Sequence, residues 1–331
     1  MLPTCQTPAR AKGAVLRALF AFLFAALALL PALAPTQALA LDKHKLILDW
    51  FPNADHVPLY VARDGGFFEK QGLAIELVAP ADPSDPLKLV AAGRATFGIN
   101  YQPNVIIARA EGLPVRSVGV LVAHPLSSLA FLKKSGIRGP ADLKGKRIGY
   151  SVEGIELALL RALVASAGLK PSDYEVVNVN FNLTAALLSG QVDAVMGAFW
   201  NYELPELALE GADGAYLALE QHGIPDYYEL IVIANDRTDR EHPELARRLV
   251  TALQQAIGFC REHPAEALAI YFKANPDVRR ELDERAFQAT LPVFATTQAQ
   301  AREKWARFAE FAVKSGMVEK AVDVDALFRN P

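Results

Sequence analysis

Two stretches of the chain gather aromatic, amide and carboxylate side chains that could bind a flat polar molecule. Residues 49–60 read DWFPNADHVPLY, and residues 198–203 read AFWNYE. Aromatic faces can stack on a ring, and an amide presents both a donor and an acceptor to a ring edge. Lysine and arginine are absent from both stretches. The pattern therefore favours a flat, neutral or weakly cationic heteroaromatic ligand.

Most of these side chains also have a structural interpretation. Trp50 could pack in the core, but its place at the end of the first expected strand favours stacking on a ligand. His56 more readily forms a structural hydrogen bond, with Asn53 or Asp55 as its local partner. Either partner could also cap the helix that follows. Cys260 is expected in a buried helix position, where cysteine behaves as a small hydrophobe.

Further candidates follow other expected strands. Glu153 opens a helix, where the helix dipole would favour an acid even without a ligand. Residues three and four positions after Phe199 share its helix face, so not every side chain of 199–203 can reach one ligand. The full predicted ligand-binding set is Asp49, Trp50, Asn53, Tyr101, Gln102, Glu153, Trp200, Asn201, Tyr202, Glu203 and Tyr228.

The same positions argue against other kinds of site. An anion site would need basic forks or a glycine-rich helix start, so sulfonate, nitrate and phosphate ligands are less favoured. We predict no catalytic residue, no metal site and no cofactor.

The first 40 residues are typical of a cleavable secretory signal. A basic start precedes the apolar run 18–33, and Ala38 and Ala40 offer the small side chains that signal peptidase admits. We expect cleavage after Ala40, export to the periplasm and no stable membrane insertion afterwards. A membrane anchor is the alternative, because the apolar run approaches the roughly 18–20 residues that span a bilayer.

The size and charge of the chain limit its partners. About 290 residues remain after cleavage, which fits two lobes of ordinary domain size. The chain has 52% hydrophobic residues, 21% charged residues and a net charge of −3. Since it lacks a basic stripe that could neutralise phosphates, we expect no nucleic-acid partner. We expect a monomer that binds a small heteroaromatic ligand.

From residue 45 onward, short β-rich runs alternate with helical runs. This alternation restarts near residue 147 and predicts an α/β fold with two doubly wound, mostly parallel sheets joined by two crossover strands. We expect lobe one to comprise residues 41–134 and 229–331, lobe two residues 135–228, and a ligand cleft at the carboxyl ends of both sheets. Helices are expected at 243–263, 264–273, 282–291 and 297–315, packed on lobe one.

Several motifs resemble those of the thiamine-pyrimidine group of type II periplasmic binding proteins, relatives of the fungal enzymes that synthesise the thiamine pyrimidine. They are LDWxPxxxHxPxY at 48–60, GI at 98–99, GxPV at 112–115, LKGKxIGY at 143–150, VDA at 192–194 and AND at 234–236. The resemblance implies a two-lobed binding protein that delivers formylaminopyrimidine or hydroxymethylpyrimidine to an ABC permease with its ATPase. It also implies that Trp50 stacks on the pyrimidine, that Asp49 belongs to the pocket, and that residues 201–203 read the ring's edge.

The chain departs from the fungal synthases at their reactive positions. The synthases carry a lysine that holds pyridoxal phosphate and, four residues on, a histidine consumed in the reaction, and these places fall at Asn100 and Asn104. Their cysteine cluster before the returning strand is replaced by IPDYY at 224–228. We therefore expect a binding protein and not an enzyme. Alternatives are a binder of riboflavin or an alkylsulfonate and, less favoured, a pyridoxal-phosphate-dependent synthase.

Overall fold

The structure, a computed structural model, describes residues 1–4 and 41–330. The predicted signal segment, with its cleavage site at Ala40, therefore lies almost entirely outside the described residues. Residues 41–331 make up one compact unit. None of the helices in the described part of the chain combines the length and the apolar character that crossing a bilayer requires.

Five strands rich in valine, isoleucine and leucine form the first sheet, in the order β2-β1-β3-β10-β4. β1 pairs in parallel with β2 and β3, whereas β10 runs antiparallel between β3 and β4. The carboxyl ends of β1 and β3 therefore lie at the same edge of the sheet. The strands are β1 (Asp42–Ile47), β2 (Leu73–Val78), β3 (Phe97–Asn100), β4 (Val115–Val122) and β10 (Leu230–Asn235).

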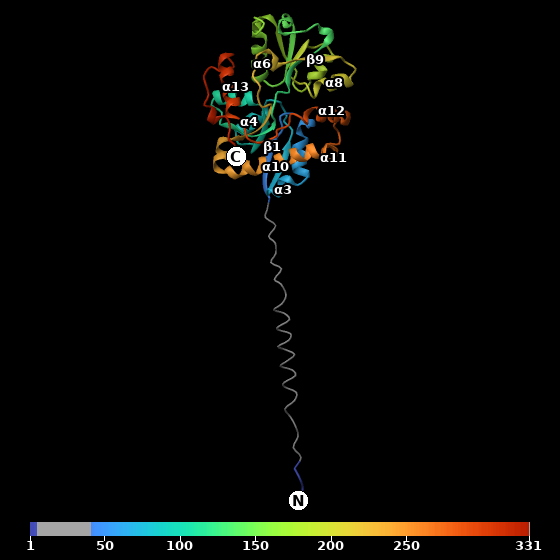
Figure 1. Ribbon diagram of the computed structural model, residues 1–331, viewed down its shortest axis with the longest axis vertical. Coiled ribbons are helices and arrows are strands. Elements are labelled where there is room, and N and C mark those ends of the chain that lie inside the picture. Colours follow the sequence, from blue (N-terminus) through green and yellow to red (C-terminus); the bar gives the residue numbers. More distant parts are fainter. Residues whose placement is uncertain (5–40, 331) are drawn as a thin grey trace. The chain divides into compact units, whose positions relative to one another are not determined.

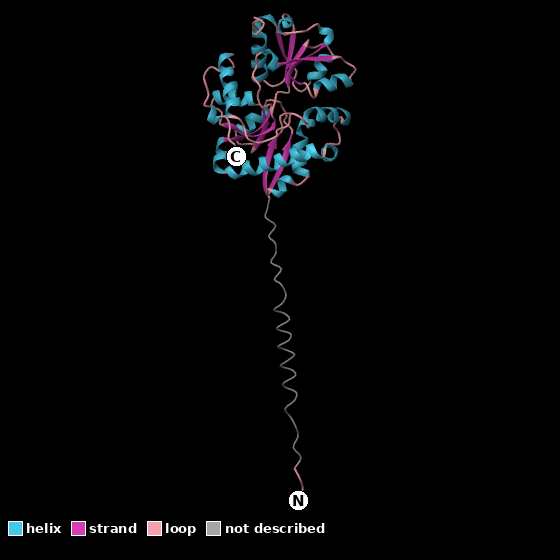
Figure 2. Cartoon of the chain, in the orientation of Figure 1, coloured by secondary structure: helices cyan, strands magenta, loops and turns pink. Residues whose placement is uncertain are grey.

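The second sheet repeats this arrangement in the order β7-β6-β8-β5-β9 (Figure 2). β6 pairs in parallel with β7 and β8, and β5 runs antiparallel between β8 and β9. The strands are β5 (Ser127–Leu132), β6 (Arg147–Tyr150), β7 (Glu175–Asn178), β8 (Ala194–Phe199) and β9 (Gly214–Ala218). The predicted α/β class with two sheets is confirmed, but the sheets are not mostly parallel, because each has two parallel and two antiparallel strand pairs.

The predicted position of the first crossover is wrong. The expected boundary at residues 134 and 135 puts β5 in lobe one, but β5 is an interior strand of the second sheet and is buried at all six positions. The first crossover is therefore 123–126. The periodicity of a buried strand shows that it is buried but not which sheet it joins. The second crossover, 223–229, contains the expected boundary between residues 228 and 229. We call the two sheets with their helices the first and second lobes.

Helices cover both sheets (Figure 1). Those that follow strands of the first sheet are α2 (Val57–Asp64), α3 (Phe67–Lys70), α4 (Asp85–Ala91) and α5 (Gln102–Ala110). Those of the second are α6 (Ile155–Ala165), α7 (Leu183–Leu188) and α8 (Glu203–Leu209). Short 3-10 helices are η1 (Ala54–His56), η2 (Lys133–Ser135), η3 (Pro140–Leu143), η4 (Pro171–Asp173), η5 (Leu219–His222) and η6 (Val324–Ala326).

The helical tail packs mainly on the first lobe, as predicted. It comprises α9 (Asp236–Glu241), α10 (Pro243–Glu262), α11 (Pro264–Ala274), α12 (Arg280–Thr290) and α13 (Arg302–Lys314). α10 and α11 contact α2, and α13 contacts α5, all of them first-lobe elements. α12 also contacts α8 of the second lobe, while its other neighbour is η1. The end of α12 therefore lies where the two lobes meet.

Candidate functional site

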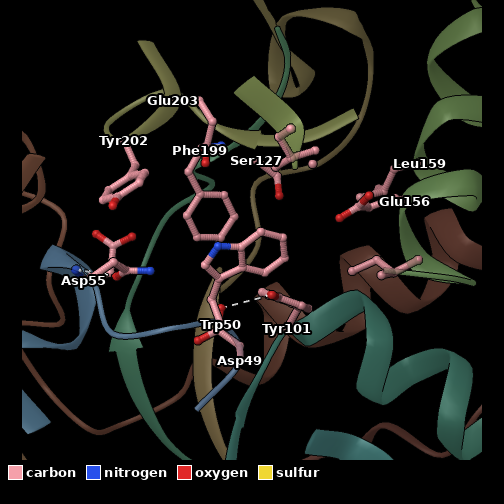
Figure 3. A pocket seen from close by; sticks show the side chains of 14 residues that line it. Asp49, Trp50, Asp55, Tyr101, Ser127, Glu156, Leu159, Phe199, Tyr202 and Glu203 are labelled. Carbon is pink, nitrogen blue, oxygen red and sulfur yellow. Dashed lines mark hydrogen bonds between the residues drawn. The ribbon is translucent and has the colours of Figure 1, made fainter. Parts of the chain in front are cut away.

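A pocket lies between the two lobes, where segments that follow β1, β3 and β8 face each other (Figure 3). The pocket is narrow in this structure, and the space that a water-sized molecule can enter is about 30 Å³. The first lobe contributes Asp49, Trp50, Asn53, Asp55 and Tyr101, and the second contributes Ser127, Ile155, Glu156, Leu159, Leu183, Gly197, Phe199, Tyr202 and Glu203. The predicted cleft at the strand ends is therefore present, and both sheets supply its walls.

The indole of Trp50 extends from the end of β1 toward the second lobe. It is half-buried and packs against a small hydrophobic cluster of that lobe, which includes Leu183. Its ring meets Phe181 edge-on, with 4.6 Å between ring centroids, and lies 5.6 Å from the ring of Phe51. Figure 3 shows the indole in the middle of the pocket. Its side chain is thus not packed inside the first lobe, and it faces the space where a ligand ring could stack.

Asp49 is buried, and protein groups occupy both of its oxygens. Nε2 of His56 lies 2.8 Å from Asp49 Oδ1, and the hydroxyl of Tyr101 donates to Oδ2 over 3.0 Å. Burial, together with this carboxylate, raises the pKa of Tyr101 well above its usual value. The predicted structural hydrogen bond of His56 exists, but its partner is Asp49. Asn53 instead accepts from the backbone N–H of Asp55 and caps η1.

Asp55 connects three elements at the pocket wall. Its Oδ1 accepts from the amide of Asn201, just after β8, over 2.7 Å and from the hydroxyl of Thr290, at the end of α12, over 2.8 Å. Its other oxygen, Oδ2, is buried and has no hydrogen-bond partner in the described part of the chain. Burial raises the pKa of this carboxyl to about 6, against the hydrogen bond from Thr290.

Two buried glutamates come from the second lobe. Glu156 on α6 accepts from the backbone N–H of Ser151 over 2.7 Å, and Glu203 accepts from that of Phe199 over 2.6 Å. Burial raises the pKa of each to about 8, so each carboxyl can carry a proton near neutral pH. Gly197 gives Glu156 its space, because a Cβ at position 197 would stand 2.2 Å from Glu156 Oε1.

Glu229 holds the two crossover segments together behind the pocket. It is fully buried, and its Oε2 accepts from the backbone N–H groups of Leu126 and Ser127 and from the hydroxyl of Tyr227. The Ser127 hydroxyl donates to its Oε1 over 3.2 Å. Burial raises the pKa of Glu229 to about 7. This carboxyl therefore fixes Ser127, which lines the pocket at the start of β5.

The ionisable lining of the pocket is acidic. Among the described residues, the ionisable side chains that line it are four carboxyls and two tyrosine hydroxyls, with no lysine, arginine or histidine. The described lining therefore offers several carboxyl oxygens that could accept hydrogen bonds from N–H groups of a ligand. It offers no basic side chain to an anion. The part of the chain that the structure covers also holds no cluster of histidine, cysteine and acidic residues suited to a metal ion.

Six of the eleven predicted ligand-binding residues line the pocket, and five do not. The six are Asp49, Trp50, Asn53, Tyr101, Tyr202 and Glu203. Gln102 and Tyr228 lie at the crossover, where Gln102 accepts from the backbone N–H of Tyr228 and the Tyr228 hydroxyl accepts from that of Ala301.

The other three predicted residues serve neighbouring segments. Trp200 donates from its indole to the carbonyl of Pro125 over 3.1 Å, and Asn201 binds Asp55 behind the wall. Glu153 is exposed, because α6 begins at Ile155 and its buried face starts there. Glu156, one helical turn later, takes the inward place that we predicted for Glu153.

Sequence reasoning missed eight lining residues. They are Asp55, Ser127, Ile155, Glu156, Leu159, Leu183, Gly197 and Phe199. Phe199 lines the pocket together with residues 202 and 203, but it ends β8 and α8 begins only at Glu203, so the helical spacing that we expected for these residues is not the cause. The apolar residues of α6 and α7 gave no signal, because their pattern is that of any core-facing helix.

The positions equated with the reactive lysine and histidine of the synthases are neutral amides. The side chain of Asn104 donates to Asn100 Oδ1 over 2.9 Å, and the same oxygen accepts from the backbone N–H of Tyr101. Asn100 thus shapes the turn that presents Tyr101, and neither residue lines the pocket.

Known proteins share this sequence over most of its length. A protein of Haemophilus influenzae, named as a thiamine biosynthesis protein, is 41% identical over 305 residues, 92% of this chain and 95% of that protein. The formylaminopyrimidine-binding protein of Halalkalibacterium halodurans is 36% identical over 76% of this chain and 78% of its own. The 4-amino-5-hydroxymethyl-2-methylpyrimidine phosphate synthase of Legionella pneumophila is 29% identical over 86% of this chain and 90% of its own.

Solved structures show the same fold. The alkanesulfonate-binding protein of Xanthomonas axonopodis pv. citri, bound to MOPS, superposes with a TM-score of 0.70 over 87% of this chain and 98% of its own, at 20% identity. The fold is therefore the two-lobed fold of periplasmic binding proteins. The family described as NMT1/THI5 like matches residues 53–267. With its two mixed sheets, its interlobe pocket and these relatives, the chain belongs to the NMT1/THI5-like family.

Proposed function

We propose that this chain is the periplasmic substrate-binding component of an ABC importer and that it binds a thiamine pyrimidine precursor, formylaminopyrimidine or hydroxymethylpyrimidine, between its lobes. The observation that carries the proposal is the lining of the interlobe pocket. Aromatic rings and carboxyls from both lobes surround it, and the described lining contains no basic group. An aminopyrimidine offers a flat ring and N–H donors, which are the complement of such a wall.

The arrangement of the rings gives this ligand a defined place. Trp50 would supply a stacking face from the first lobe, while Phe199 and Tyr202 approach from the second. The carboxyls of Asp55 and Glu203 would accept from the ring's edge. The relative named as a formylaminopyrimidine-binding protein supports the same ligand class, since the similarity covers most of both chains.

An alkylsulfonate is the main alternative among binding functions, because an alkanesulfonate-binding protein shares the fold. At 20% identity that likeness concerns the fold alone. A sulfonate would find no guanidinium or ammonium in the described lining, and burying an unpaired anion is strongly unfavourable. Riboflavin would have to fit its larger ring system into the same space. Direct titration with each compound shows whether the protein binds riboflavin or a single pyrimidine.

An enzymatic role is the second alternative, because several relatives are named as synthases. A synthase that forms an imine needs a lysine, and position 100 carries an asparagine whose amide oxygen is already engaged. We therefore propose binding without catalysis. Added pyridoxal phosphate should give no Schiff-base absorption band and no product trapped by borohydride, and a trapped adduct would establish the enzymatic alternative.

Two crossover segments joined by Glu229 suggest a hinge, so we propose that the lobes close on the ligand and that the closed form is recognised by the permease. Small-angle scattering with and without a ligand that demonstrably binds tests this movement. Identical curves would contradict it.

The decisive experiment identifies the ligand directly. Mass spectrometry of the small molecules that copurify with the protein should find an aminopyrimidine. Titration with hydroxymethylpyrimidine, formylaminopyrimidine, riboflavin and an alkanesulfonate, followed by tryptophan fluorescence, should give saturable binding for the pyrimidines alone. Trp50→Phe should remove most of the fluorescence change, whereas Trp200→Phe should keep it, because only the first indole lines the pocket. Saturable sulfonate binding without pyrimidine binding would overturn the proposal.

A further inference from the structure

Asp55 lines the pocket and has one carboxylate oxygen without a hydrogen bond from any described residue. The residue is 1% exposed, and its Oδ2 has no partner among the residues that the structure describes. A buried carboxylate oxygen without a hydrogen bond is strongly unfavourable, so such an atom at a pocket wall points to a donor that arrives with a ligand. Figure 3 places Asp55 and Tyr202 to one side of the Trp50 indole and Glu156 to the other.

The other oxygen of Asp55 is tethered. Asn201 and Thr290 both hydrogen-bond to Oδ1, and they come from the second lobe and from the end of α12. Two hydrogen bonds from different elements hold Oδ1 in place, which leaves Oδ2 as the acceptor that no described residue occupies, on a side chain that lines the pocket. The other carboxyls of the lining are occupied differently, since Asp49 has a partner on each oxygen.

We propose that Asp55 is the residue that selects an amino group on the ligand ring, by accepting an N–H of that group at Oδ2. This inference rests on the proposed function, and it deepens that function by naming the group that distinguishes an aminopyrimidine from its oxo counterpart. An oxo group would place a carbonyl oxygen against Oδ2. Two acceptors would then meet without a proton between them.

The tether makes the isosteric substitution informative. In Asp55→Asn, the NH2 group of Asn201, which donates to Oδ1 and to the Thr290 hydroxyl, holds the amide oxygen at the place of Oδ1. The NH2 group of the new amide then takes the place of Oδ2 and faces the ligand. An acceptor becomes a donor, so preference should move from the amino ligand toward the oxo ligand.

The experiment compares two probes by calorimetric titration at pH 7.5: 4-amino-5-hydroxymethyl-2-methylpyrimidine and the same molecule with a 4-oxo group in place of the amine. The wild type should prefer the amino probe. In Asp55→Asn this preference should fall by about 10- to 100-fold, the size expected when a hydrogen bond to a charged acceptor is replaced by two facing donors. Asp55→Ala, which has neither donor nor acceptor, should bring the two affinities close together.

Asp283→Asn is the matched control. Asp283 lies on α12 beside Asp55 and is fully buried, but it does not line the pocket. Its neutralisation should leave the preference unchanged, and thermal melting shows which variants are folded. A folded Asp55→Asn or Asp55→Ala protein that keeps the wild-type preference would overturn the inference. If the wild type binds neither pyrimidine, the proposed function fails instead, so the two failures are distinguishable.

Discussion

Gly197 offers a sharp test of how the pocket is built, because substituting this residue would destabilise the protein for two separate reasons. Its φ is +86°, a conformation that side chains with a Cβ rarely adopt. A Cβ at this position would also stand 2.2 Å from Oε1 and 2.3 Å from Cδ of the buried Glu156 side chain. Gly197→Ala should therefore strain the backbone and push Glu156 out of its place in the wall.

Gly223 separates these two costs. Its φ is +87°, almost the same, but a Cβ there would meet no atom within 4 Å. Gly223→Ala should destabilise the protein by about 1–2 kcal/mol, the cost of the left-handed conformation alone. Gly197→Ala adds overpacking of about 1–3 kcal/mol, which gives a total of about 2–5 kcal/mol.

Urea denaturation of both variants measures the difference, and ligand titration measures the effect on the pocket. Combining Gly197→Ala with Glu156→Ala removes the three side-chain atoms nearest to the new methyl group, so the double variant should be more stable than the sum of the single variants predicts. Equal destabilisation by the two glycine substitutions, or strict additivity in the double variant, would refute this account of the wall.

Three further predictions concern the neighbouring side chains. Trp50→Ala should weaken ligand binding by about 1–3 kcal/mol, by analogy with base stacking on aromatic side chains, whereas Trp200→Phe should leave it unchanged; equal affinities for Trp50→Ala and wild type would remove Trp50 from the site. Tyr101→Phe should destabilise the fold by about 1–3 kcal/mol, because it leaves Asp49 Oδ2 buried without its donor, while the exposed Tyr216→Phe should have no effect in the same urea assay. Burial raises the pKa of Glu203 to about 8, so the folded protein binds this proton more tightly than the unfolded chain does. The contribution of Glu203 to stability is therefore present at low pH and is lost as pH rises toward 8. Glu203→Gln should therefore gain stability relative to wild type between pH 5 and pH 8, and a pH-independent difference between the two proteins would contradict the raised pKa.

Helices and strands were predicted well where residues close together in the sequence mark them. The long helix α10 begins at the predicted Pro243 and ends one residue early, because its apolar face and flanking prolines mark it. α13 was predicted from residue 297 but begins at Arg302. The intervening residues are used elsewhere: Gln298 exchanges two hydrogen bonds with the backbone of Val120, and Gln300 binds Asn330 and Ser117.

The predictions are wrong where contacts between residues far apart in the sequence determine the structure. β5 follows β4 after four residues, and nothing in its own pattern indicates that it pairs with β8 and β9 instead. The choice between Glu153 and Glu156 depends on where α6 begins, and a shift of two residues there turns an expected ligand-binding acid outward. Helix boundaries are the least reliable part of a sequence-based prediction, so a site residue chosen from the first turn of a helix inherits that error.

Asp55 shows why the residues of a pocket between two lobes are hard to predict when the sequence after each strand is considered by itself. From the sequence it is a local residue, a candidate partner of His56 or a cap for the next helix. In the structure its Oδ1 is held by Asn201 and Thr290, which lie 146 and 235 residues away along the chain. Those distant partners hold one carboxylate oxygen of a side chain that lines the pocket, and burial raises its pKa although both hydrogen bonds lower it. The residue type supplied the carboxyl, but only the meeting of the two lobes turned it into a selective acceptor.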